Sequence, residues 1–401
     1  MRLFSISAGA LVLVPALFAA DAQAQMRFVP IGDFPGGPSS PLPAPEFYSN
    51  ANGVSGDGLT IVGNGRSVNG FADAFLWREG SGLLSLGDLP GGTYTSQAFA
   101  ASFDGSVIVG NSITSADFPN QNQGFRWTQA TGMISLGTLP GAQDFSNASD
   151  VSADGSVVVG WAQSANSGEM SGEAFRWTEA GGMVGLGSLP SASFGSFAHA
   201  VSGDGSVIAG AARSNNASSG SLEPFRWTQS QGMQGLGFLP GGSGGEARGI
   251  SADGTYIVGN TNSTNGVEAF IWSEGTGMVG LGDLEGGAFS SLAVAVSADG
   301  SIAVGHGYDD SGRVAMLWLR DEGMFDLRQF LMNDGVGGLD DWWLQAATGI
   351  SDDGRVISGF GINPSGDVEG WMAVIPEPSS FALVGIGALA LLPRRRSQVS
   401  V

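Results

Sequence analysis

The chain has 401 residues, with 37 acidic side chains against 16 basic ones and a formal net charge of −21. It contains no cysteine, which excludes disulfides, cysteine metal ligands and cysteine nucleophiles. A surface this acidic repels nucleic acid, so nucleic acid is not an expected partner, while 42% hydrophobic residues and 67 glycines predict a large, turn-rich globular domain.

The first 24 residues have the features of a secretory signal peptide. Arg2 supplies a positive charge, residues 3–20 form a short apolar stretch, and small residues stand at Ala22 and Ala24. We expect signal peptidase to cleave after Ala24, with Ala22 as the other site. An uncleaved membrane anchor is the alternative. Export predicts a location at the cell surface or outside the cell.

Residues 25–375 are predicted to form one domain made of seven repeats of about 50 residues. Each repeat contains a Val-Ser-x-Asp-Gly element or a variant of it, a segment ending in tryptophan, and in most copies Leu-Gly-x-Leu-Pro-Gly or a relative, which is degraded over residues 324–330. The first element begins at residues 54, 101, 151, 201, 250, 296 and 350. The tryptophans are Trp77, Trp127, Trp177, Trp227, Trp272, Trp318 and Trp371.

Each repeat reads as four short strands. In the third repeat we expect strands over residues 148–152, 156–160, 174–178 and 183–189, with a polar loop over 161–172. Asp154-Gly155 is typical of a tight turn because glycine tolerates positive φ. Four strands repeated seven times predict an all-β fold, a seven-bladed β-propeller. A β-solenoid or two smaller β domains are the alternatives.

The two ends of the domain are expected to pair. The last repeat has strands only over residues 344–351, 355–358 and 370–375, and lacks a fourth. The missing strand is predicted at the other end, over Arg27–Phe34, before the first Val-Ser-x-Asp-Gly. Pairing of this strand with the last repeat would close the ring.

The repeats resemble the HAF repeats of extracellular bacterial proteins, which are named for a His-Ala-Phe triplet. The matching positions are Asp73-Ala74-Phe75, Glu173-Ala174-Phe175 and Glu268-Ala269-Phe270, with weaker matches at Gly124-Phe125 and Pro224-Phe225. The downstream Trp, Gly-Met, Leu-Gly-x-Leu and Ser-x-Asp-Gly elements also match, and the resemblance covers residues 28–375. Histidine is absent from every copy of the triplet. The resemblance implies an extracellular setting and no particular reaction.

Repeated polar residues are interpreted as structural. One Asp-Gly pair per repeat is too few oxygen ligands for calcium, so we expect turns. Arg126, Arg176 and Arg226 follow a phenylalanine that faces the core, and we expect them to point outward and pair with surface acids rather than form an anion-binding ladder. No metal, cofactor or catalytic constellation is predicted.

Candidate ligand contacts stand where the sequence departs from the repeat. His306 lies near Tyr308 and Asp309, and Trp342 and Trp343 lie in an inserted segment beside acids, where tryptophans could stack on sugar rings. The structural interpretation is that the tryptophans fill the ring where the closing blade meets its neighbour. The other histidine, His199, is expected in a strand beside apolar residues.

Residues 376–401 resemble a PEP-CTERM sorting domain. Pro376-Glu377-Pro378 precedes an apolar run, residues 381–392, and the cluster Arg394, Arg395 and Arg396. The resemblance implies cleavage near Pro376-Glu377-Pro378 by an exosortase-type protease. A helix there would anchor the chain transiently in the inner membrane, with the arginines on the cytoplasmic side. An ordinary C-terminal anchor is the alternative.

Together these features predict an exported, non-enzymatic repeat protein. It would act as a structural or binding module of the cell surface or of the extracellular polysaccharide matrix, with polysaccharide as the expected partner. The alternative function is a polysaccharide lyase or glycosidase on a propeller scaffold, because acids are plentiful although none is singled out by its spacing.

Overall fold

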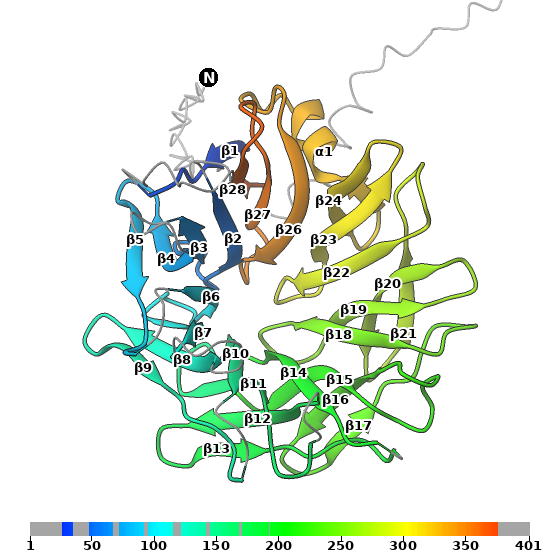
Figure 1. The fold of residues 1–401 in the computed structure, drawn as a ribbon. Coiled ribbons are helices and arrows are strands. Elements are labelled where there is room, and N and C mark those ends of the chain that lie inside the picture. Colours follow the sequence, from blue (N-terminus) through cyan, green and yellow to red (C-terminus); the bar gives the residue numbers. More distant parts are fainter. Residues whose placement is uncertain are drawn as a thin grey trace, which may run out of the picture.

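Each sequence repeat forms one four-stranded antiparallel sheet, and the seven sheets stand around a central axis as the blades of a β-propeller (Figure 1). The predicted fold class is therefore confirmed. The computed structural model describes residues 26–34, 48–66, 72–91, 95–114, 122–141, 145–167, 171–191 and 193–375. The predicted signal peptide and sorting tail, including Ala24, Pro376 and Arg394, lie outside the described residues.

The blades are numbered here by their first, innermost strands. In blades 1 to 7 these are β2 (Ser49–Val54), β6 (Ser96–Ala101), β10 (Ser146–Val151), β14 (Ser196–Val201), β18 (Gly245–Ile250), β22 (Ser291–Val296) and β26 (Trp343–Ile350). The second strands are β3 (Ile61–Arg66), β7 (Val107–Ile113), β11 (Val157–Ala162), β15 (Val207–Ala212), β19 (Ile257–Asn262), β23 (Ile302–Asp309) and β27 (Val356–Ile362).

The outer half of each blade is built from the tryptophan segment and a short edge strand. The third strands are β4 (Ala72–Arg78), β8 (Asn122–Thr128), β12 (Glu173–Thr178), β16 (Glu223–Thr228), β20 (Val267–Ser273), β24 (Gly312–Leu319) and β28 (Val368–Val374). The fourth are β5 (Gly82–Gly87), β9 (Gly132–Ser135), β13 (Gly182–Gly185), β17 (Gly232–Gly235), β21 (Gly277–Gly282), β25 (Gly323–Asp326) and, in blade 7, β1 (Arg27–Pro30).

The Ser-x-Asp-Gly sequence makes the turn between the first two strands of every blade. In blade 4 the Ser202 hydroxyl donates to Asp204 Oδ1 at 2.7 Å and accepts from the Val207 N–H at 3.0 Å. Gly205 has φ +70°, which a side chain would disfavour. The same Ser-to-Asp hydrogen bond recurs in all seven turns. The aspartates therefore stabilise the turns by accepting these hydrogen bonds.

Hydrogen bonds between neighbouring turns tie the blades together at this end of the axis, called here the turn face. The Phe103 N–H of blade 2 donates to Ala153 O of blade 3 at 3.0 Å, and Asp352 N–H of blade 7 donates to Gly56 O of blade 1 at 2.9 Å. Six of the seven neighbouring pairs are joined in this way. The inner ends of the blades are thus fixed relative to one another by backbone contacts.

The ring closes with one strand from the N-terminal region and three from the C-terminal region. Strand β1 pairs antiparallel with β28, with Arg27 opposite Val374 and Pro30 opposite Trp371. Phe28 packs edge-to-face on Trp342, with ring centroids 5.0 Å apart, and Trp342 is buried. The predicted closure and the structural interpretation of Trp342 are confirmed. The ring of Trp343, in contrast, is 40% exposed.

Several boundaries differ from the sequence prediction: β1 ends at Pro30 rather than at Phe34, and β27 extends to Ile362 rather than ending at residue 358. The fourth strand of blade 3 ends at Gly185 rather than at residue 189, because Gly187 turns the backbone to φ +78°. Strand β11 extends through Trp161 and Ala162, which were expected in a loop. The degraded segment after β25 contains helix α1 (Leu327–Asn333), capped by the Asp326 side chain. Among the described residues no helix is long and apolar enough to cross a membrane.

Candidate functional site

Every innermost strand has a β-bulge at the same place. In blade 4 the pairing passes from Ala198 opposite Gly210 to Ala200 opposite Ala209, so His199 has no residue opposite it. A bulge bends the strand and redirects the extra side chain. The seven bulged residues are Asn52, Phe99, Ser149, His199, Arg248, Val294 and Thr348. We call them the bulge ring.

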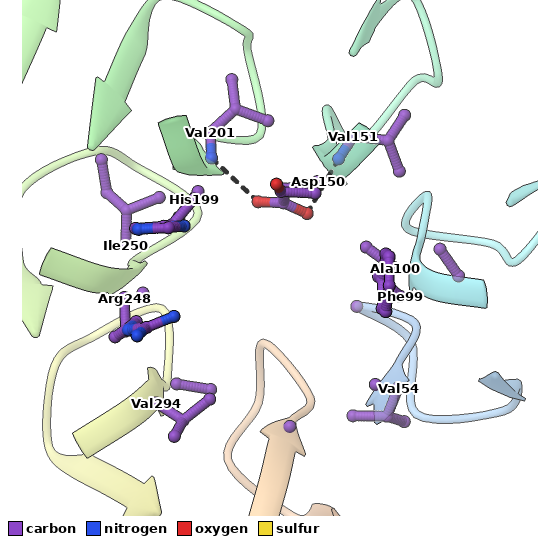
Figure 2. A pocket seen from close by; sticks show the side chains of 18 of the residues that line it. Val54, Phe99, Ala100, Asp150, Val151, His199, Val201, Arg248, Ile250 and Val294 are labelled. Carbon is purple, nitrogen blue, oxygen red and sulfur yellow. Dashed lines mark hydrogen bonds between the residues drawn. The ribbon is translucent and has the colours of Figure 1, made fainter. Parts of the chain in front are cut away.

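All seven bulge-ring residues line one cavity of about 490 Å³ on the propeller axis (Figure 2). This is the size range of small-molecule sites in proteins. The residue before each bulge is alanine in all seven blades, whereas the seven bulged residues are all different. A repeated backbone therefore lines a single cavity with seven different residues.

The basic side chains of the cavity wall, His199 and Arg248, come from blades 4 and 5. Arg248 donates to Glu246 Oε2 at 2.5 Å, and His199 Nε2 lies 3.8 Å from the same oxygen. Burial, followed by the Arg248 charge, lowers the pKa of His199 to about 3. The imidazole is thus neutral at physiological pH, and its contact with Glu246 is a polar contact rather than an ion pair.

Asp150 stands beside the bulge of blade 3, where the other six blades have only glycine or alanine. Its Oδ1 accepts from the Val151 N–H and its Oδ2 from the Val201 N–H, both at 2.8 Å, so the carboxyl group links blade 3 to blade 4. Burial raises the pKa of Asp150 to about 7, and Asp352 adds to the rise. Asp150 therefore exchanges a proton near neutral pH.

The opposite part of the wall is neutral or apolar. Figure 2 shows Phe99 across the cavity from His199 and Arg248. Trp161 lines the same cavity and packs on Phe197 with ring centroids 5.3 Å apart. Such a site offers aromatic surfaces together with hydrogen-bonding groups, which suits a ring-shaped ligand with an apolar face and a hydroxylated edge.

The residues predicted from sequence as ligand contacts lie elsewhere, at the end of the axis opposite the turn face, called here the loop face. His306, Tyr308 and Asp309 follow one another along β23, and Trp343 begins β26 in the next blade. Trp343 Nε1 donates to the Arg313 carbonyl at 2.9 Å, and an Arg313 nitrogen lies 3.3 Å from His306 Nδ1. The structure thus brings His306 and Trp343 to one neighbourhood, while Trp342 is core.

The arginines of the third strands do not pair with acids as predicted. Arg126 donates to the Gly155 carbonyl at 3.4 Å and Arg226 to the Gln231 side chain at 3.2 Å. The ion pairs recorded among the described residues do not involve Arg126, Arg176 or Arg226. All three are half-buried, and the partners of Arg126 and Arg226 are a backbone carbonyl of the next blade and an amide oxygen of the same blade. Within the described part of the chain, no group of three His, Asp or Glu side chains is arranged to hold a metal ion.

The sequence did not point to the bulge ring, because none of its seven residues belongs to a recognisable motif within its own repeat. The signal was present in the alignment of the repeats: a variable residue follows an alanine that never varies. His199 was noted only as a histidine beside apolar residues, and Arg248 and Asp150 were not singled out. Their shared position becomes significant only once the first strands surround one axis.

Neither the models of known protein families nor the curated proteins match this sequence. Among solved structures, oligogalacturonate lyase from Vibrio parahaemolyticus superposes with a TM-score of 0.55 at 12% identity, covering 88% of this chain and 98% of that one. TolB from Acinetobacter baumannii superposes with a TM-score of 0.45 at 15% identity. The match covers 67% of this chain and 62% of the TolB chain. Prolyl oligopeptidase B from Galerina marginata superposes with a TM-score of 0.46 at 11% identity, and the match covers 80% of this chain and 47% of that one. At these identities the likeness concerns the fold alone.

Proposed function

We propose that this protein is an exported, non-enzymatic binding module of the cell surface or extracellular polysaccharide matrix, and that its axial cavity holds part of a carbohydrate ligand. The observation that carries the proposal is the bulge ring: seven equivalent backbone positions direct seven different side chains into one cavity. Asn52 and Thr348 also bond the next blade through their side chains, whereas within the described part of the chain the other five bulge-ring residues form no such bond.

The chemistry of the cavity favours a neutral or weakly charged polyhydroxylated ligand. Among the residues that the structure describes, Arg248 is the only arginine on its wall, and it is already paired with Glu246, so there is little net positive charge to hold a strong anion. Ser149 and His199 offer hydrogen-bonding groups for hydroxyls, and Phe99 and Trp161 offer aromatic faces. Sugars combine both kinds of surface in one molecule.

A glycan array probed with the purified full chain, labelled at its surface, tests the proposal. We expect binding to a defined subset of glycans and a loss of at least about tenfold in affinity for Arg248→Gln and for Phe99→Ala. Leu59→Ala, at a side chain that is 69% exposed, is the matched control. Retention of no glycan, or equal binding by all three variants, would contradict the proposal.

A second candidate function is that of a polysaccharide lyase or glycosidase. It is favoured by one observation: Asp150 and Asp352 line the same cavity and the pKa of both carboxyl groups is raised, chiefly by burial. Glycosidases use two carboxylates of which one is protonated. Against it, both Asp150 oxygens already accept backbone N–H groups. Release of reducing ends from a bound polysaccharide, abolished by Asp150→Asn, would favour the enzyme.

The export part of the proposal rests on the sequence of the two ends. Signal peptidase would remove residues 1–24 and an exosortase-type protease would process the tail near Pro376-Glu377-Pro378. Fractionation of cells that produce the full chain, or the chain without residues 376–401, tests it. We expect the full chain at the cell surface or in the medium. Cytoplasmic retention of the full chain would contradict export.

A further inference from the structure

A second region with ligand-binding character lies on the loop face between blades 6 and 7, outside the axial cavity. It centres on the Arg313 side chain of β24. The guanidinium lies 5.6 Å over the ring of Phe360 in blade 7, and one of its terminal nitrogens lies 3.3 Å from His306 Nδ1. Because an arginine only donates, His306 Nδ1 must accept, and the imidazole is then neutral. Burial, followed by Arg313 and Arg248, lowers the pKa of His306 to about 4, in agreement with that role.

Arg313 is a partly buried cation that has no acidic partner among the described residues. The recorded ion pairs do not include it, although the sequence has 37 acids. The nearby acids are engaged otherwise: Asp309 accepts from the Ser311 N–H and hydroxyl, and Asp310 accepts from Gly287 N–H. The buried Nε of Arg313 has no hydrogen-bond partner. Burial also lowers the pKa of Arg313, which means that its charge is held at a cost in solvation.

An exposed tryptophan contacts the backbone of the same arginine. Trp343 is fixed by the bond from its Nε1 to the Arg313 carbonyl, yet its ring is 40% exposed. It also lines a cavity of about 250 Å³, whose polar lining residues are Ser311, Asp326, Arg328 and Asp341. Asp341 has φ +59°, the one positive φ of a non-glycine residue in the described chain. Strained backbone of this kind is concentrated at binding sites.

From this arrangement we infer a second binding site, for the carboxylate of an acidic sugar, in which Arg313 receives the carboxylate and Trp343 supports the sugar ring. The planar guanidinium fork matches a carboxylate, and the terminal nitrogens of Arg313 carry the donors that such a ligand would meet. Ser311 and Asp341 are placed to meet hydroxyl groups in the adjoining cavity. The inference is independent of the axial cavity and holds whether or not that cavity binds a glycan.

The indole N–H resonance of Trp343 reports on this site directly. In the full chain labelled with nitrogen-15 tryptophan, Trp343→Phe identifies that resonance, and the other nine of the 10 tryptophans report on the fold. We expect D-glucuronate to shift the Trp343 resonance with an affinity at least about tenfold higher than that of its uncharged methyl ester, because only the free acid forms charge-assisted hydrogen bonds.

Arg313→Gln is expected to abolish this preference while leaving the other resonances in place. Arg320→Gln is the matched control, since Arg320 of the same blade lies 4.7 Å over Tyr256 on the turn face. It should bind glucuronate as the unmodified chain does. The inference is overturned if glucuronate and its methyl ester act alike on the unmodified chain, a result that needs no variant to fold. It is also overturned if folded Arg313→Gln keeps the preference.

Discussion

Single residues decide what the axial cavity presents, because the backbone around it is repeated seven times. Asp150 is the clearest case. Where the other blades have glycine or alanine, it places a carboxyl group between two blades and binds a backbone N–H from each. Its hydrogen bonds favour the charged form, yet burial outweighs them and raises the pKa to about 7.

Asp150 should make the stability of the protein depend on pH. Its pKa is higher in the folded state than the usual 3.8, so the folded protein binds the extra proton and stability falls as the pH rises from about 4 to about 7. The effect is at most about 4 kcal/mol and smaller if water enters the cavity. Urea unfolding at several pH values measures it. In the Asp150→Asn variant the free energy of unfolding should no longer fall over this pH range. If this variant kept the pH dependence of the unmodified chain, the explanation would be contradicted.

At the scale of strands, the repeat is held together by polar side chains that bridge neighbouring blades. The serine that begins five of the inner strands bonds the preceding blade: the Ser146 hydroxyl donates to Gly137 O at 2.8 Å and accepts from Gly124 N–H at 3.0 Å. The other four serines are Ser49, Ser96, Ser196 and Ser291. Blade 5 has Gly245 instead.

The acid of the HAF-like triplet also has a structural role. Glu173 Oε1 accepts from the Gly187 N–H at 3.1 Å, and Glu223 and Glu268 bond the equivalent glycines Gly237 and Gly282. The acid thereby holds the end of the fourth strand where the backbone turns away at positive φ. The acid at this position is therefore accounted for by the turn that it stabilises.

Ser146→Ala should destabilise the protein by about 1–3 kcal/mol, because it leaves a buried N–H and a buried carbonyl without their partner. Ser146 is fully buried. Ser230→Ala, in an exposed turn, is the control and should be close to neutral. Chemical unfolding monitored by tryptophan fluorescence compares the two. Equal midpoints would show that the serine bridges contribute little to stability.

At the scale of the molecule, stability depends on closing the ring with β1. The strand covers the outer edge of blade 7 and places Phe28 against Trp342 and Trp371. On the outside, Arg27 pairs with Glu79 of blade 1, with a second bond of 2.7 Å, and lowers the pKa of that carboxyl. That exposed pair adds little, so burial of Phe28 and the β1–β28 hydrogen bonds supply most of the closure.

Deletion of residues 26–34 should open the ring. We expect a lower unfolding midpoint and access of a soluble quencher to Trp371, which is fully buried in the closed ring. The milder change Phe28→Ala should cost about 2–3 kcal/mol, since the side chain is only partly buried. Iodide quenching and thermal unfolding make the comparison. A deletion variant with the midpoint and quenching of the unmodified chain would exclude a stabilising role for β1.

The amino-acid sequence by itself determined the blades, their number and the strand that closes them. Asp-Gly turns, strands of alternating burial and the absence of a fourth strand in the last repeat are local features, and local features can be seen in the chain. Helix α1 and the early end of β13 were missed, because a cap at Asp326 and a positive φ at Gly187 override the repeat pattern.

Only the tertiary structure decided where ligands could bind. Whether His199 or Arg248 points to the axis depends on a bulge, which exists only once two strands have paired in register. Their common cavity exists only once seven blades have closed around it. The same holds for Arg313 and Trp343, which are 30 residues apart in the sequence and meet because two blades pack together. Binding chemistry here is a property of side chains that converge from different repeats, and the order of residues in one repeat does not contain it.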